Sequence, residues 1–248
     1  MLKTLRRKVV KAIRASKKKP VSLGILDIYG RRIDDALEYF YPKQITGIPV
    51  FAVDSVYKHY LPKINEIKER SGIGSHRLHG DEKVLDLLFT ETIKRYISYV
   101  HMLPASENHH HSTPGGMILH SLESSLYALR YAKENRPESL GMSDLDKQSE
   151  LPYRYAAWLA AFMHDAGKVL RDIVVDAAEL QNGSINTRVT AKSNIPSWQP
   201  QKESLVDWAK RFGVARYSVT YLESRIHNQH NVDSVQLLDP VLGKGYAL

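Results

Sequence analysis

The chain has 248 residues, of which 43% are hydrophobic and 25% are charged, as in globular proteins with a sizeable core. The absence of cysteine excludes disulfides and thiolate metal sites, so any metal must be held by His, Asp or Glu. No apolar run approaches the roughly 18 residues of a membrane-spanning helix, so we expect no membrane insertion.

The net charge of +8 is concentrated in one segment. The first 19 residues hold nine Lys or Arg and no acid, leaving 26 basic residues against 27 acidic ones in the rest of the chain. Apolar residues from Leu2 to Ile13 recur at helical spacing, which predicts a basic amphipathic arm. A DNA backbone is the favoured partner; a solubilising helix end, an anionic membrane surface and a targeting peptide are the alternatives. The residues expected to contact DNA are Arg6, Arg7, Lys8, Lys11, Arg14, Lys17, Lys18 and Lys19.

The first half of the chain is expected to be helical after Pro20 ends the arm. The expected elements are a helical piece at 34–40, a linker or turn at 47–50, a helix at 50–71 broken near Pro62, a helix capped by Asp81 and closed by Pro104, and a helix from Pro114 to about Asn135.

The second half changes from helical periodicity to strand periodicity and back. The expected elements are a polar loop at 136–150, an apolar helix that Pro152 starts and that runs to Leu170, two strands at about 172–192 around Asn182-Gly183, and helices at about 201–212 and 217–231 separated by Gly213. The predicted fold class is therefore mainly α with one inserted β-hairpin.

The stretch "AFMHDAGK" carries the most chemical information. His164 and Asp165 are adjacent at the end of an apolar helix, where an imidazole and a carboxylate are costly unless they are paired or bound to a metal. Together they supply the nitrogen and oxygen ligands that suit Mn, Fe, Zn or Ni. Lys168 falls on the same helical face and could hold a phosphate beside the metal. A buried His–Asp hydrogen bond is the simpler alternative.

Further histidines lie at positions from which they could join such a site. His120 follows "ENHHHSTPGG" on a predicted helix and shares its face with Glu123. His227 and His230 share a face of the last predicted helix, and Asp233 joins that face if the helix continues past residue 231. In the triplet, His110 and His111 are favoured over His109 as inward-pointing residues. We expect His76 and His79 at the surface, and His59 and His101 to be ordinary helix histidines.

These motifs resemble those of the HD-domain metal-dependent phosphohydrolases, in which His-Asp-x-Gly-Lys is a common form. "LPASENHHHSTPGGMILHSLES" is similar to the signature of the HD-fold conjugative relaxases of the histidine-triplet, MobH-type, TraI-like class. The resemblance covers Ile48 to His230. Members of this class are usually much longer, so the chain resembles a domain or a shortened relative.

The resemblance implies an HD-domain-like helical bundle at 48–248 with the hairpin inserted at about 172–192, preceded by an extension at 21–47 and the arm at 1–20. It implies one or two divalent ions (Mn, Fe, Zn or Mg), a bacterial cytoplasmic location, and as partners DNA at the origin of transfer and other conjugation proteins. The implied metal ligands are His110, His111, His120, His164, Asp165, His227, His230 and Asp233, with Asp239 as a substitute for Asp233, and Asp165 and Lys168 take the catalytic roles.

The expected function is metal-dependent nicking of one DNA strand at a transfer origin. The attacking group is left open between a tyrosine, with Tyr99, Tyr127 and Tyr131 nearest the motif, and a water activated by the metal. The alternatives are an HD phosphohydrolase acting on nucleotides or cyclic dinucleotides, and a non-catalytic DNA-binding module with a vestigial metal site.

Overall fold

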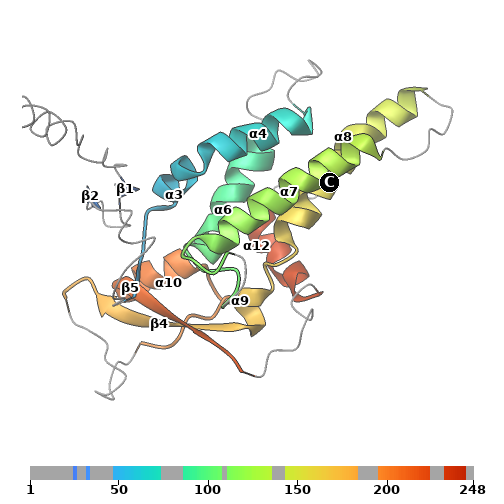
Figure 1. The fold of residues 1–248 in the computed structure, drawn as a ribbon. Helices are drawn as coiled ribbons and strands as arrows, with labels where there is room; N and C mark the ends of the chain where they lie inside the picture. The colour runs from blue at the N-terminus through green and yellow to red at the C-terminus, as the bar shows by residue number, and fades with distance from the viewer. Residues whose placement is uncertain are drawn as a thin grey trace, which may run out of the picture.

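A computed structural model of the chain describes residues 47–73, 86–107, 111–135, 143–183, 195–223 and 232–243, with only the backbone at 143–149 and in a short strand pair, β1 (Ile25–Leu26) and β2 (Arg32–Ile33). These residues form a mainly helical structure with a three-stranded antiparallel sheet (Figure 1). The mainly α fold class is therefore confirmed. No helix in these described ranges is both long and apolar enough to cross a membrane.

The helices of the first part of the fold pack around a continuous apolar core. Figure 1 shows α4, α7 and α8 running beside one another, with α6 crossing next to them. In α6, Ile93, Tyr96, Ile97 and Val100 recur every three or four residues, and all are fully buried. The elements are α3 (Val53–His59), α4 (Leu61–Ser71), the π-helix η2 (Asp86–Glu91), α6 (Thr92–Val100), α7 (Gly116–Glu134) and α8 (Ser143–Met163).

Two of the expected helix boundaries have opposite outcomes. The break near Pro62 is confirmed, because α3 and α4 are separate helices joined at Tyr60. The expected start of α8 at Pro152 is wrong, since the helix begins at Ser143 and contains the proline. An interior proline removes one helical hydrogen bond. Packing of α8 against α7 and the 2.6 Å ion pair between Glu150 and Arg154, which spans the proline, offset that loss.

The sheet joins three segments that are distant in sequence. Its order is β3 (Ile48–Pro49), β5 (Val214–Tyr221), β4 (Ile173–Leu180), and all neighbours are antiparallel. The predicted strand at β4 is confirmed, but residues 184–192, the expected second strand of the hairpin, lie outside the described residues.

Two expectations about the sheet segments are wrong. Residues 47–50 are not a linker, because they contain β3, and the helix expected from Tyr217 is strand β5 up to Tyr221. "VARYSVTY" is rich in β-branched and aromatic residues, which fit a pleated surface. Its pairing with two other strands outweighs any helical periodicity.

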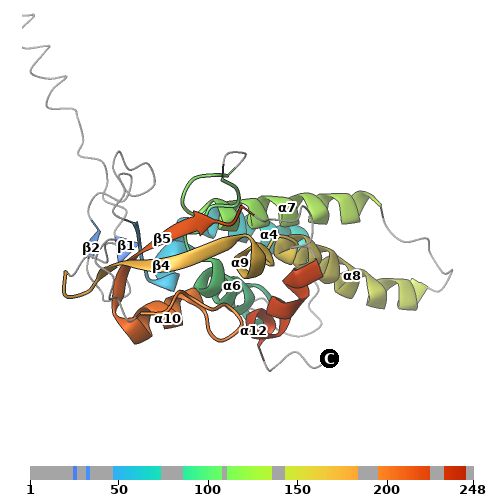
Figure 2. The same cartoon turned by 90° about the horizontal axis from the view of Figure 1, so that it is seen from below.

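Short elements complete the fold below the bundle, as Figure 2 shows from the underside. Ser204 caps α10 by accepting the Asp207 N–H, so the helix begins later than the expected residue 201. Gly213 ends it in a left-handed conformation, as the sequence predicts. Arg95 of α6 donates to the carbonyls of Val241 and Leu242, which fixes the C-terminal helices to the bundle. The elements are α9 (Lys168–Arg171), α10 (Leu205–Phe212), the 3-10 helix η3 (Ser234–Leu237) and α12 (Leu238–Leu242).

His101 connects the helices to the sheet and is not an ordinary helix histidine. It follows α6 with a φ of 40° and is fully buried. Its Nε2 accepts the N–H of Phe51 at 3.0 Å, and its Nδ1 lies 3.0 Å from the hydroxyl of Tyr217. Burial lowers the pKa of His101 to about 4, against the opposing effect of its hydrogen bond to Phe51, so the imidazole is neutral.

Candidate metal centre

His164 and Asp165 lie in a tight turn that follows α8. The helix ends at Met163, and residues 164–167 form the turn that leads into α9. A hydroxyl from the C-terminal part of the chain braces this turn: Ser234 Oγ donates to the carbonyl of His164 and accepts the N–H of Gly167, both at 2.8 Å. The turn is therefore fixed at its first and last residues by one side chain.

His120 of α7 joins this pair from 44 residues away in sequence. Its Nε2 lies 3.2 Å from His164 Nε2 and 3.2 Å from Asp165 Oδ2, and His164 Nε2 lies 3.6 Å from Asp165 Oδ1. Neighbouring ligands around a metal with bonds of about 2.1 Å are about 3.0 to 3.4 Å apart, depending on geometry. The three residues form a group whose ligand atoms lie within 4.8 Å of one another, and two nitrogens with one carboxylate suit Mn, Fe or Zn.

A backbone contact fixes the form of His164 that a metal requires. His164 Nδ1 lies 2.7 Å from the carbonyl oxygen of Ala161, which can only accept a hydrogen bond. Nδ1 therefore carries a proton, so in the neutral ring the lone pair belongs to Nε2, which faces His120 and Asp165. Metal-binding histidines commonly donate a hydrogen bond to a carbonyl from the N–H of their second ring nitrogen in this way.

Asp165 is held in its charged form. Burial alone would raise its pKa, but hydrogen bonds from His120 and Lys168, together with the positive charge of Lys168, hold the pKa of Asp165 well below its usual range. Lys168 Nζ donates to Asp165 Oδ2 at 2.7 Å and to the carbonyl of Ala105 at 3.0 Å. The lysine expected to reach a phosphate is thus engaged with the carboxylate and with the loop before the histidine triplet.

A second row of polar side chains extends from His120 along the start of α7. The rings of His111 and His120 have centroids 5.3 Å apart, and His111 Nε2 lies 3.3 Å from Glu123 Oε2. Glu123 also accepts from Lys63 of α4 at 3.0 Å. His111, the member of the triplet that the structure describes, therefore lies next to His120, beside the group that His120 forms with His164 and Asp165.

The triplet loop is packed closely against the N-terminus of α7. His111 has a φ of 56°, and its carbonyl accepts the N–H of Ala105. A Cβ on Gly116 would lie 2.0 Å from that carbonyl oxygen. The glycine pair of the Pro-Gly-Gly motif is therefore needed where the loop approaches the helix.

The other sequence-predicted site residues are not brought to the group by the described structure. The buried carboxylate of Asp233 pairs with Arg171 and accepts from Gln236 at 3.1 Å. His110, His227, His230 and the arm residues expected to bind DNA lie outside the described residues. Sequence reasoning missed Ser234 and Lys63, since a serine or lysine distant from the motif carries no signal of where it will lie.

A comparison with protein families finds one match, to the TraI_2 family, described as "Putative helicase", over residues 57–245. The chain belongs to this family. The matched region includes every residue of the group and of the second row. Membership in the TraI_2 family relates the chain to the TraI proteins of conjugation and supports a relaxase-related function that involves DNA. A search of curated proteins finds no match.

Proposed function

We propose that this TraI_2 chain is an HD-type, metal-dependent relaxase domain that nicks one DNA strand at an origin of transfer. The observation that carries the proposal is the convergence of His120 with His164 and Asp165, in a chain related to TraI. The two 3.2 Å separations from His120 Nε2, to His164 Nε2 and to Asp165 Oδ2, and the contact of His164 Nδ1 with the Ala161 carbonyl support binding of a divalent cation.

The roles of the residues follow from their contacts. His120 and His164 offer ring nitrogens, and Asp165 offers a negative oxygen that stays charged although it is buried. The side chain of His164 is 36% exposed and that of Asp165 only 7%, so a substrate phosphate would approach from the histidine side. Lys168 acts through Asp165, which it orients. A divalent cation bound there would polarise the scissile phosphate and stabilise the developing charge.

The remaining parts of the chain are assigned by sequence. We propose that the basic arm at 1–20 follows the DNA backbone, that 21–47 is an extension, and that 48–248 is the relaxase domain in a bacterial cytoplasm. Other conjugation proteins are further candidate partners. The sequence contains no G-x-x-x-x-G-K-S/T phosphate loop, which supports strand cleavage rather than ATP-driven unwinding as the activity of this chain.

The test is conversion of supercoiled plasmid carrying the cognate transfer origin to the nicked form, with Mn²⁺ supplied. We expect nicking by the wild type, none after chelation, and none by His164→Ala. His59→Ala, a histidine of α3 outside the group, is the matched control and should nick normally. Turnover of nucleotides or cyclic dinucleotides without origin nicking would replace the proposal with a phosphohydrolase, and DNA binding unchanged by His164→Ala with no nicking by the wild type would replace it with a binding module.

Metal analysis of the purified protein separates the two buried aspartates. Asp165→Asn should lose bound metal, because it removes the only charge among the three grouped ligands. Asp233→Asn should keep the metal and weaken only its own pairing with Arg171. Equal metal loss in both variants would mean that Asp233 is a ligand as well.

A further inference from the structure

We propose that the outer face of α7 and the cleft beside it form a track for single-stranded DNA that leads away from the metal centre. The inference rests on the proposed function, because a centre that cuts one strand must hold that strand while its bases are unpaired. It adds a binding surface with stacking residues, which neither the metal group nor the basic arm supplies.

Two tyrosines of α7 are displayed to solvent in line with His120. Tyr127 and Tyr131 are 67% and 66% exposed, although large aromatic side chains are usually covered. They lie seven and eleven residues after His120, close to two and three helical turns, so all three share one stripe of the helix. At a rise of about 1.5 Å per residue, the rings lie roughly 10 and 16 Å along the helix from the candidate ligand.

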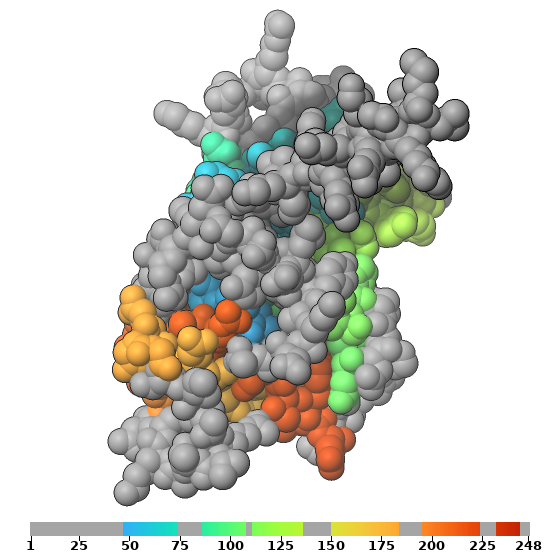
Figure 3. Space-filling model, turned by 60° about the vertical axis from the view of Figure 1, so that its left-hand side comes forward, coloured from blue at the N-terminus to red at the C-terminus, as the bar shows by residue number. Residues whose placement is uncertain are grey.

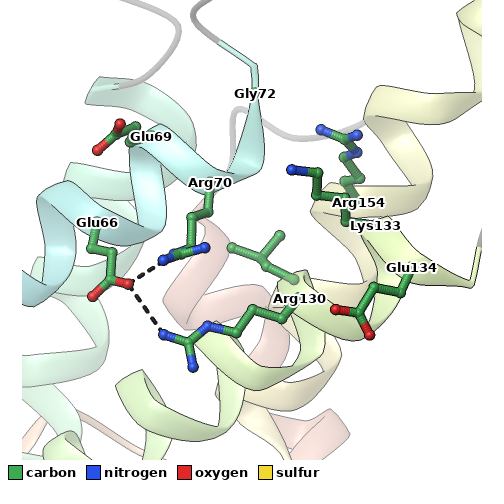
Figure 4. Close-up of a pocket in the computed structure, with 9 residues that line it drawn as sticks. Glu66, Glu69, Arg70, Gly72, Arg130, Lys133, Glu134 and Arg154 are labelled. Atoms are coloured by element: carbon green, nitrogen blue, oxygen red, sulfur yellow. Dashed lines mark hydrogen bonds and ion pairs between the residues drawn. The ribbon is translucent and has the colours of Figure 1, made fainter.

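A cleft of about 630 Å³ opens beside this stripe, between α4, α7 and α8. Figure 4 shows the side chains of Arg70, Lys133 and Arg154 around one opening between the helices. Arg130 joins the two features, because it lines the cleft and also lies over the Tyr127 ring at 5.6 Å. Figure 3 shows a green stripe of surface, from residues around the start of α7, next to orange-red surface from the C-terminal part of the chain.

The charged side chains of the cleft leave one place, at Lys133, that favours binding of a phosphate backbone. Glu66 is shared between Arg70 and Arg130, to which it is bound at 2.8 and 3.3 Å, and its single charge balances only one of them. Arg154 pairs with Glu150. Lys133 forms no ion pair with any residue in the described ranges and is the cation most available to a ligand. Three carboxylates and four cations line the cleft, so its net charge is small. The exposed tyrosines are therefore the stronger support for binding of a single strand.

The arrangement matches what single strands require. Proteins that bind single strands without reading sequence combine cations along the backbone with aromatic rings on which unpaired bases stack. Two exposed rings one turn apart, an arginine over one of them and an available lysine beyond supply both parts. In duplex DNA the bases are already stacked on one another, so no base is available to stack on the tyrosine rings.

The test compares binding of a fluorescein-labelled mixed-sequence single strand with binding of its duplex, by anisotropy, using the full chain in chelator. We expect the double variant Tyr127→Ala/Tyr131→Ala to bind the single strand about tenfold more weakly than the wild type and the duplex equally well. Tyr127→Phe/Tyr131→Phe should bind the single strand within about twofold of the wild type, since stacking needs the ring and not the hydroxyl. Lys133→Gln should lower the salt slope of single-strand binding by about 0.7, and Lys210→Gln on α10 is the matched control outside the cleft.

The basic arm is unchanged in all of these variants, and photo-crosslinking distinguishes strand contacts on α7 from contacts on the arm. A strand carrying 5-iodouracil should crosslink to the peptide that holds Tyr127 and Tyr131. The proposal is overturned if the double alanine variant binds single strands as tightly as the double phenylalanine variant, if duplex binding falls equally, or if crosslinks avoid this peptide.

Failure of the track and failure of the metal centre give different results. Because chelator is present, His164→Ala should bind the single strand like the wild type. If the wild type never nicks DNA but the double alanine variant binds single strands more weakly, the proposed track is supported and the proposed nicking reaction is not. If the wild type nicks DNA but the double alanine variant binds single strands as tightly as the wild type, the nicking reaction is supported and the track is not.

Discussion

At the scale of single residues, the candidate metal ligands His120, His164 and Asp165 depend on a residue that is not itself a candidate ligand. Ser234 reaches the turn from 70 residues beyond His164 and satisfies one carbonyl and one N–H. This one hydroxyl ties the start of the turn to its end. Outer-shell partners of this kind determine how well ligands stay aligned.

We predict that Ser234→Ala will weaken metal binding about 10- to 100-fold, because the turn loses the hydroxyl that fixes His164 relative to Gly167. Competition with a fluorescent chelator measures the affinity. Ser71→Ala is the matched control, since Ser71 is also buried and also donates to a carbonyl, but lies at the end of α4. Equal affinity in the two variants would contradict a positioning role.

At the scale of elements, the helical motifs could be predicted from the sequence and the pairing of strands could not. The periodicity of α6 and α7 and the glycine after α10 are local signals, and each predicts its element correctly. Strand β5 depends on partners 40 and more than 160 residues away, so its own pattern does not show them. The start of α8 could not be predicted, because packing against α7 outweighs the local effect of a proline.

The residues of the candidate site divide in the same way, into those that a local sequence signal reveals and those that only contacts between distant segments place. His120, His164 and Asp165 stand out because polar ligands sit on apolar helices, a local anomaly that the sequence shows directly. Which of the remaining histidines and aspartates join them depends on how distant segments meet. Asp233 shows this, since its neighbour Ser234 braces the turn while its own carboxylate pairs with Arg171.

The close approach of the histidine loop to α7 gives a prediction about glycine. Gly116→Ala should destabilise the fold by several kcal/mol or displace the loop, because the new Cβ would meet the His111 carbonyl oxygen at 2.0 Å. Gly213→Ala should cost only about 1 kcal/mol, since its positive φ is strained but its Cβ meets nothing within 4 Å. Chemical denaturation of both variants tests the difference, and similar losses of stability would contradict the close approach.

The junction between α6 and the sheet gives a prediction about pH. His101 has a pKa of about 4 when folded and 6.5 as its ordinary value. Between these values the unfolded chain binds a proton that the folded chain does not, so stability is lost as pH falls from 6.5 to 4, by on the order of 3 kcal/mol. Denaturant titrations at several pH values should show a shallower loss for His101→Gln. Tyr217→Phe keeps the imidazole and should therefore keep the steep loss; a shallow loss there would point to another titrating group.

At the scale of the whole molecule, charge is divided between an arm of nine cations and a nearly neutral body. We predict that replacing Arg6, Arg7, Lys8 and Lys11 with Gln will weaken duplex binding and lower the salt slope by about 0.9 for each phosphate that the arm no longer neutralises. The free energy of unfolding should stay unchanged. Anisotropy at a series of salt concentrations measures the slope, and the same slope in wild type and variant would exclude the arm as the segment that binds DNA.

The brace from Ser234 also sets where the protein can be shortened. A fragment that stops before η3 would contain His120, His164 and Asp165 in full, yet its turn would be without the hydroxyl that closes it. Arg95 also anchors the backbone carbonyls of Val241 and Leu242, so a truncation that keeps the fold must come after these residues as well. A shortened protein that keeps the candidate site intact should therefore extend through residue 243, well past Asp165, the last residue of the group.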